Sequence, residues 1–210
     1  MTLAVGTFWT LPRTAGVIIV GSAVLLAVVG IIFSFRGDVR ATEAMFRDID
    51  VAIGNTTTLR VMALSWGAWS LAVLAGFVVL AVEYWNRDVR VIPTLAVVGL
   101  IVFTVAWVIE AAFHSSVTVW AVGQLEQGVE VPALFDELKR WLNLWVQVLV
   151  NPLALLSFIG LAFVGMRTEV VPSWAGWGII IWSGLFLFFP LPLAIAPVAL
   201  FFGVVLLING

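Results

Sequence analysis

Long apolar runs alternate with short polar segments along this chain. A helix needs about 20 apolar residues to cross the hydrocarbon core of a bilayer, and five runs meet this length. The last run, residues 172–208, is too long for one helix, and Pro190-Leu191-Pro192 divides it because proline cannot continue a helix interior. We therefore predict an all-α fold, a polytopic bundle of six transmembrane helices at residues 14–35, 61–82, 91–113, 141–166, 172–189 and 191–208.

The composition agrees with a lipid-facing surface. Hydrophobic residues make up 63% of the 210 positions, charged residues make up 10%, and the mean hydropathy is +1.17. A soluble domain is about half apolar and about a quarter charged, so it could not cover this apolar excess with polar surface. We expect one integral membrane domain over residues 1–210, with the lipid bilayer as its main partner.

Two polar connections carry helical patterns of their own. Between the first and second spans, apolar residues recur at helical spacing and predict an amphipathic helix at the membrane interface. These residues are Met45, Phe46, Ile49, Ala52 and Ile53. The second connection, residues 124–140, places Leu134, Phe135, Leu138 and Trp141 on one side. It should lead helically into the fourth span.

Arginine placement bears on the orientation in the membrane. Six spans put Arg13, Arg87, Arg90 and Arg167 on one side, and six other basic residues on the opposite side. Four of those six lie in the longer first loop among acidic residues, whereas positive charge in short loops indicates the cytoplasmic side more reliably. We expect both termini in the cytoplasm, with the chain in a prokaryotic plasma membrane.

Charge and rare residues exclude several functions. The net charge of −2 provides no basic surface for nucleic acid. The chain has no cysteine and only one histidine, so it cannot form a thiolate site or a histidine-rich metal centre. No phosphate-binding loop, dinucleotide fingerprint or metalloprotease motif occurs. We expect no metal, no cofactor and no catalytic residue set.

The polar pair Glu110 and His114 is the clearest candidate for chemistry. The two residues stand four apart, so they project from one face of the third predicted helix. An ionised carboxylate near hydrocarbon is costly, so such residues normally face a bundle interior or an aqueous cavity. The pair could relay protons, anchor a ligand or serve only as a structural pair near the membrane surface.

A second candidate lies on the fourth predicted helix. Asn143, Gln147 and Asn151 repeat at intervals of four and form a polar stripe. The amides could hydrogen-bond across helices as structural links, or they could line a pocket together with Glu110 and His114. Trp107, with other tryptophans well inside the spans, could line the same cavity, although packing is the commoner role of such residues.

The order of features resembles a family of prokaryotic six-helix membrane proteins known as domain of unknown function 4386. The similar segments are Trp107-Val108-Ile109-Glu110-Ala111-Ala112, the long first loop and the Val171–Gly178 start of the fifth span. The chain differs from the family pattern at Ser173, where a basic residue is usual, and in its last span, which lacks an acid. The resemblance implies six helices and assigns no activity.

Three functions remain open at this point. The first is a non-enzymatic module, either an accessory subunit of a membrane complex or a binder of a small apolar or lipid-like ligand between the third and fourth helices. The second is a small proton-coupled transporter that uses Glu110 and His114, with a homo-oligomer supplying the missing half of the pathway. The third, and least supported, is an intramembrane enzyme.

Overall fold

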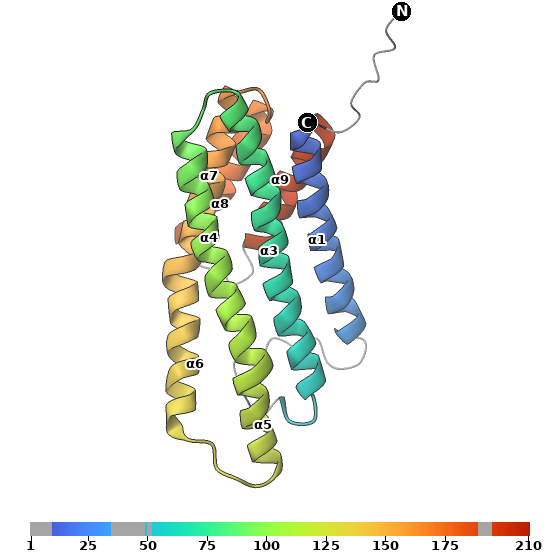
Figure 1. The fold of residues 1–210 in the computed structure, drawn as a ribbon, viewed down its shortest axis with the longest axis vertical. Helices are drawn as coiled ribbons and strands as arrows, with labels where there is room; N and C mark the ends of the chain where they lie inside the picture. The colour runs from blue at the N-terminus through green and yellow to red at the C-terminus, as the bar shows by residue number, and fades with distance from the viewer. Residues whose placement is uncertain (1–9, 35–48, 50–51, 189–194) are drawn as a thin grey trace, which may run out of the picture. The chain divides into compact units, whose positions relative to one another are not determined.

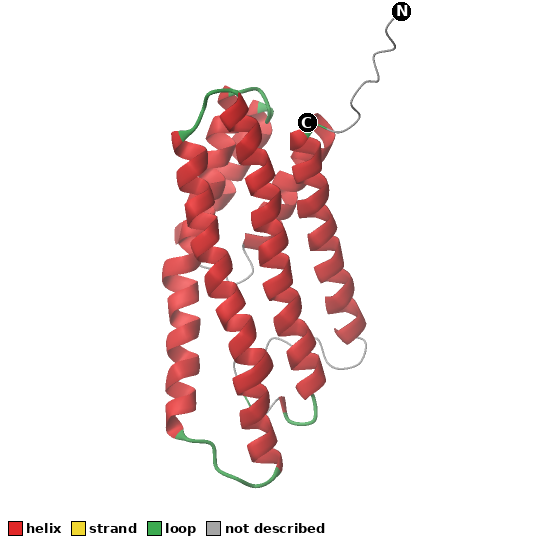
Figure 2. Cartoon of the chain, in the orientation of Figure 1, coloured by secondary structure: helices red, strands yellow, loops and turns green. Residues whose placement is uncertain are grey.

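The computed structural model describes residues 10–34, 49, 52–188 and 195–210. Every regular element in this part of the chain is a helix, and none is a strand (Figure 2). Four of these helices are long and apolar enough to cross a membrane. The all-helical fold class is therefore confirmed, and the four helices agree with an integral membrane protein.

The helices follow one another with short connections (Figure 1). Two of them are unbroken runs that each contain a π-helical segment, Val91–Glu126 and Ala133–Arg167. The elements are α1 (Leu11–Ser34), α3 (Thr56–Asn86), α4 (Val91–Ala112), η2 (Phe113–Thr118), α5 (Val119–Glu126), α6 (Ala133–Trp145), η3 (Val146–Val150), α7 (Asn151–Arg167), α8 (Ser173–Phe188) and α9 (Ile195–Asn209).

The two long runs exceed the thickness of the hydrocarbon core. They contain 36 and 35 residues, which corresponds to about 54 Å and 52 Å, whereas the core is about 30 Å thick. The predicted spans 91–113 and 141–166 lie inside these longer helices. The extension through residues 114–126 was not predicted, because its apolar residues Ala121 and Val122 are buried in protein and form no continuous apolar run.

Only part of the predicted amphipathic helix can be located. Met45 and Phe46, like Pro190-Leu191-Pro192, lie outside the described residues. Ala52 is fully buried in a small apolar cluster with Leu59 and Val122, and Ile49 packs against this cluster. Ile53, in contrast, is exposed. The described end of the segment therefore packs against α3 and α5 of unit 2 through Ala52.

The chain divides into two compact units. Unit 1 contains residues 1–21, 72–100 and 154–210, and unit 2 contains residues 22–71 and 101–153. Each unit combines parts of several helices that lie far apart in the sequence. The polar residues singled out from the sequence, Glu110, His114 and the three amides, all belong to unit 2.

Unit 1 is held together by close approaches at glycines. The fully buried Ile19 of α1 lies against both Gly76 of α3 and Gly203 of α9, where an added Cβ would lie 2.5 Å and 2.8 Å from its side chain. A Cβ at Gly16 would meet the α9 backbone at 2.7 Å. Small residues that let helix backbones approach are the usual means of helix association in lipid.

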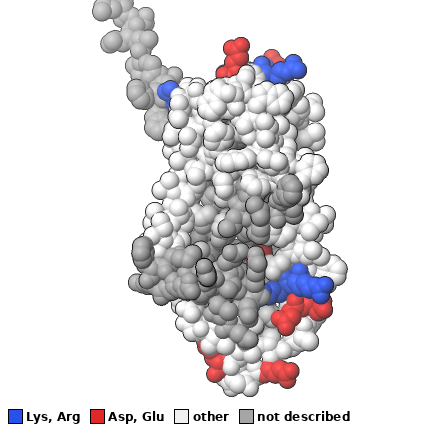
Figure 3. Space-filling view, turned by 180° about the vertical axis from the view of Figure 1, so that it is seen from behind, with Lys and Arg blue, Asp and Glu red and all other residues white. Residues whose placement is uncertain are grey.

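The charged side chains of unit 1 gather where α3 ends and α4 begins. Figure 3 shows acidic and basic side chains together at this end of the unit. The neighbouring ends of α1 and α9 lie there as well, since a Cβ at Gly210 would be 2.6 Å from Pro12 (Figure 1). The charged residues concerned are Arg13, Glu83, Arg87, Asp88, Arg90, Arg167 and Glu169.

We predict that Gly16→Ala destabilises the protein, whereas Gly21→Ala on the same helix does not. The Gly16 methyl would push α9 away at a cost of about 1–3 kcal/mol. A methyl at Gly21 would meet no atom within 4 Å, and alanine is the better helix former. Thermal unfolding in detergent, followed by tryptophan fluorescence, measures both variants. Equal stability of the two would contradict the packing described for Ile19 and Gly16.

Candidate functional site

Glu110, His114 and Thr118 form a polar chain along one helix face in unit 2. His114 Nε2 lies 3.9 Å from Glu110 Oε1, and His114 Nδ1 lies 3.1 Å from Thr118 Oγ1. The three side chains are buried, with exposed fractions of 8% for Glu110, 2% for His114 and 0% for Thr118. The predicted pairing at a spacing of four is thus present, and Thr118 extends it by one turn.

The helix that carries this chain changes its winding there. Residues Phe113–Thr118 form the π-helix η2, in which backbone hydrogen bonds run from i to i+5. Arg60 donates from Nε to the Ser115 carbonyl oxygen at 3.3 Å, so a side chain from α3 contacts the backbone of this segment. Single π-turns inside α-helices are frequent at functional sites.

Four aromatic rings of α3 and α4 pack one turn away from Glu110. Trp66 stacks on Trp107 with ring centroids 5.5 Å apart, and Trp69 meets Trp66 edge-on at 5.5 Å. Phe103 contacts Trp69 at 6.5 Å and Trp107 at 6.1 Å. We call these four residues the aromatic cluster. Trp66, Trp69 and Trp107 are three of the tryptophans that lie well inside the predicted spans.

A glycine brings the two helices together beside this cluster. A Cβ at Gly67 would lie 3.0 Å from the Ala111 Cβ, so α3 and α4 nearly touch next to Glu110. Thr104 adds a hydrogen bond from its hydroxyl to the Ser70 carbonyl oxygen at 3.2 Å. The cluster is therefore built on a tight helix pair and is held in place by backbone proximity.

The amide stripe is joined to the cluster through one residue. Trp107 donates from Nε1 to Asn151 Oδ1 at 3.2 Å, and Asn151 donates from Nδ2 to Gln147 Oε1 at 3.5 Å. Asn143 is half-buried and makes no hydrogen bond with the described residues. The π-helix η3 (Val146–Val150) lies between Asn143 and Asn151 and alters the regular spacing of the stripe. Asn151 therefore links helices, as the structural interpretation of the stripe requires.

Two buried polar atoms of unit 2 have no hydrogen-bond partner among the described residues. They are Glu110 Oε2, an acceptor when ionised, and Trp69 Nε1, a donor. A buried polar group that lacks a partner costs about 1–3 kcal/mol. Such atoms are uncommon in folded proteins, and each calls for an explanation such as a ligand.

Lys139 is a residue that the sequence did not indicate for this site. It stands two residues before the predicted span 141–166, yet only 6% of it is exposed, and its charge acts on His114. Phe135, one turn earlier on α6, stacks on Phe113 of η2 at 5.8 Å. The spacing of four between Phe135 and Lys139 could have indicated this face, whereas Leu134 and Leu138 of the predicted apolar side are exposed.

The donor set does not suggest a metal centre. In the described part of the chain, no three histidine, aspartate or glutamate side chains gather closely enough to hold a metal ion. What the arrangement offers is a carboxyl group, an imidazole and a hydroxyl in series, next to an aromatic surface. These groups can bind, orient or pass on a proton.

Comparisons with family models, with curated proteins and with solved structures find no match to this chain. The resemblance to the six-helix family accordingly stays a prediction. The site must be interpreted from its own geometry.

We predict that Asn151→Ala destabilises the protein by about 1 kcal/mol more than Asn143→Ala. The first change removes the acceptor of the Trp107 N–H and the donor to Gln147, whereas Asn143 has no such bonds to lose. Thermal unfolding in detergent provides the comparison. A larger loss for Asn143→Ala would show that the stripe is ordered by contacts other than the Trp107 hydrogen bond.

Proposed function

We propose that this chain is a non-enzymatic, multi-pass membrane protein that binds a small lipid-like molecule at Glu110 and the aromatic cluster. The observation that carries the proposal is the buried Glu110 Oε2, which has no hydrogen-bond partner among the described residues, on a residue one helical turn from Trp107. A ligand with one hydrogen-bond donor would satisfy this oxygen. Its apolar part would lie along the tryptophan rings.

Helix lengths support a site near the membrane surface. Counting about 20 residues from Val91, the first residue of α4, reaches Glu110. Counting the same number back from Arg167, the last residue of α7, reaches Val148, beside Gln147 and Asn151. In a membrane, the polar residues would then lie where hydrocarbon meets headgroups. That level suits a molecule with a polar head and an apolar tail.

Six crossings complete the proposed architecture. The helices α8 and α9 contain 16 and 15 residues without any charged side chain, and they would cross with local thinning of the bilayer. The chain then enters and leaves on one side, together with Arg13, Arg87, Arg90 and Arg167. We propose that this side is cytoplasmic, in the plasma membrane of a prokaryote.

A catalytic role is less well supported. Thr118 Oγ1 is within hydrogen-bond distance of His114, and Glu110 lies on the other side of the imidazole, an order that resembles a nucleophile with its base. However, the Thr118 side chain is fully buried. A substrate carbonyl could not reach it without a rearrangement of the helices around η2.

Proton transfer is the second candidate function. Thr118 follows Glu110 by eight positions, so the series from Glu110 through His114 to Thr118 extends about 12 Å along the helix axis. Each of these groups can accept and release a proton, as a relay requires. An accessory subunit within a larger complex, or a homo-oligomer, could use the same series.

We predict that Glu110→Gln lowers the retention of a co-purified lipid-like molecule about tenfold, because an acceptor of a charge-assisted hydrogen bond is lost. Thermal stability should change little, since no described residue hydrogen-bonds to Oε2. Solvent extraction of the purified protein, followed by mass spectrometry, measures the bound molecule. Glu137→Gln, an exposed change in unit 2, is the control.

Loss of the folded Glu110→Gln protein would contradict the ligand role and indicate a structural one. An unchanged extract would contradict it as well. Proton uptake by liposomes that contain the protein tests the second candidate. A pH-sensitive dye should report no uptake if the protein only binds, and uptake that Glu110→Gln abolishes would establish transport instead.

We predict opposite labelling of two single cysteines introduced into this cysteine-free chain. Asp88 precedes the helix Val91–Glu126, and Gln127 follows it, so a crossing places them on opposite sides. In intact cells a membrane-impermeant maleimide should label Gln127→Cys and reach Asp88→Cys only after permeabilisation. The reverse pattern would invert the proposed orientation, and labelling of both would contradict the crossing.

A further inference from the structure

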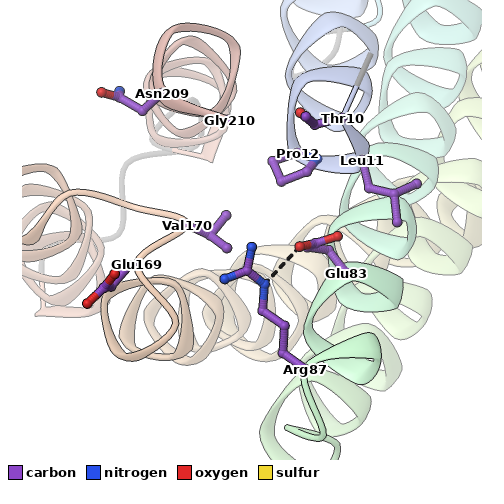
Figure 4. A pocket seen from close by; sticks show the side chains of 9 residues that line it. All are labelled: Thr10, Leu11, Pro12, Glu83, Arg87, Glu169, Val170, Asn209 and Gly210. Atoms are coloured by element: carbon purple, nitrogen blue, oxygen red, sulfur yellow. Dashed lines mark hydrogen bonds and ion pairs between the residues drawn. The ribbon is translucent and has the colours of Figure 1, made fainter. Parts of the chain in front are cut away.

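A separate pocket opens at the charged end of unit 1. It has a volume of about 320 Å³, near the lower end of the range for small-molecule sites, about 300–1,000 Å³. Figure 4 shows how α1, the end of α3, the segment after α7 and the end of α9 surround it. Its lining residues are Thr10, Leu11, Pro12, Glu83, Arg87, Glu169, Val170, Asn209 and Gly210.

Arg87 is fixed in this pocket by two hydrogen bonds. Its Nε donates to Glu83 Oε1 at 2.8 Å, and its Nη1 donates to the Thr168 carbonyl oxygen at 2.7 Å. The remaining nitrogen, Nη2, donates to no described residue. In Figure 4 the guanidinium lies between Glu83 and Val170. A held guanidinium with spare N–H groups is well suited to a phosphate or a carboxylate.

The acidic residues make the pocket suitable for a cation as well. Glu83 Oε2 and both carboxylate oxygens of Glu169 accept no hydrogen bond from a described residue. Glu169 lies at the rim, with its side chain turned away from Arg87 (Figure 4). The side chains of the lining, two carboxylates and one guanidinium, sum to one net negative charge. A ligand with both an anionic and a cationic group therefore matches this pocket better than a simple anion does.

The backbone at Glu169 supports a role for this side chain. Its φ of 60° is left-handed, in the position after α7 where glycine is usual. A residue other than glycine, asparagine or aspartate there is strained. Asp88 has a φ of 61° at the corresponding position after α3, but it does not line the pocket. The chain therefore retains a carboxylate at a position where its backbone disfavours one.

The pocket lies at the level of lipid headgroups if the helices cross the membrane. It is formed by the first residues of α1 and the last residues of α3 and α9, next to the exposed charges of Asp88 and Arg90. Leu11, Pro12 and Val170 supply its apolar wall. A molecule that carries charge at one end and is apolar at the other would meet both kinds of surface.

From these observations we propose that the unit 1 pocket binds a zwitterion made of a primary amine and a phosphate, such as the headgroup of phosphatidylethanolamine. The phosphate accepts hydrogen bonds from Arg87 Nη2. The ammonium group donates to Glu83 Oε2, and the Glu169 carboxylate at the rim adds negative charge that favours the cation. This site is independent of the Glu110 site in unit 2 and of the function proposed for it.

Native mass spectrometry of the full chain in detergent tests the site. The probes are phosphatidylethanolamine, phosphatidylcholine and phosphatidylglycerol with identical acyl chains. We expect phosphatidylethanolamine to be retained about tenfold more than the other two, because a quaternary amine cannot donate hydrogen bonds and glycerol carries no cation. Arg87→Gln should abolish this preference. Arg90→Gln, an exposed change nearby, should leave it intact.

Arg87 also links α3 to the residue after α7, so Arg87→Gln can lower stability. Glu169→Gly avoids this problem, since it relieves the left-handed strain and removes only a carboxylate. It should raise thermal stability and reduce the preference about threefold. Asp88→Gly is its matched control, since it removes a carboxylate that does not line the pocket, and it should leave the preference unchanged.

Free phosphoethanolamine tests whether the ligand is a membrane lipid or a soluble zwitterion with the same amine and phosphate groups. Stabilisation of the protein by the free compound without retention of the lipid would assign the site to a soluble zwitterion. Equal retention of the three lipids together with no effect of phosphoethanolamine would overturn the proposal. An equal loss of preference in Arg90→Gln and Arg87→Gln would also overturn it.

Discussion

Hydrocarbon offers no hydrogen-bond partner to a polar group, and this constraint governs most of the polar contacts in the protein. Hydroxyl and amide side chains on the helices donate back to carbonyl oxygens of their own turn. Ser65 bonds to the Val61 oxygen at 2.7 Å, and Asn209 bonds to the Val205 oxygen at 2.9 Å. Thr104 bonds across to the neighbouring helix. Against this background, Glu110 Oε2 and Trp69 Nε1 are unusual, because they are buried and no described residue hydrogen-bonds to them.

Association of the helices follows from the same constraint. Lipid removes the hydrophobic driving force between helices, so close packing has to supply it. Ile19 meets this requirement in unit 1 by fitting against two glycines from different helices. In unit 2 the contact between Gly67 and Ala111 brings α3 onto α4 and allows Trp66 to stack on Trp107. The aromatic surface beside Glu110 is thus a consequence of a glycine on the facing helix.

The sequence predicted the helices well because length and apolarity determine them directly. It also predicted the Glu110–His114 pair, since a spacing of four is local to one helix. It did not predict the π-helices, which depend on backbone hydrogen bonding, or the burial of Lys139 beside His114, which depends on the packing of α6. The sequence also did not indicate a pocket at Glu83 and Arg87, which stand four apart at the end of the second predicted span. Their role in a pocket appears only through Thr168, 81 residues away from Arg87.

Glu110 also shows why binding is better supported than proton relay. In either protonation state Oε2 needs a partner, because an ionised oxygen requires a donor and a protonated one requires an acceptor. A relay needs a further group next to Glu110 Oε2 to continue the series, and the described residues provide none. A bound molecule needs to supply a single donor, and the tryptophans already offer it an apolar surface. Ligand binding therefore requires one additional group at Glu110, whereas a proton pathway requires a continued series of them.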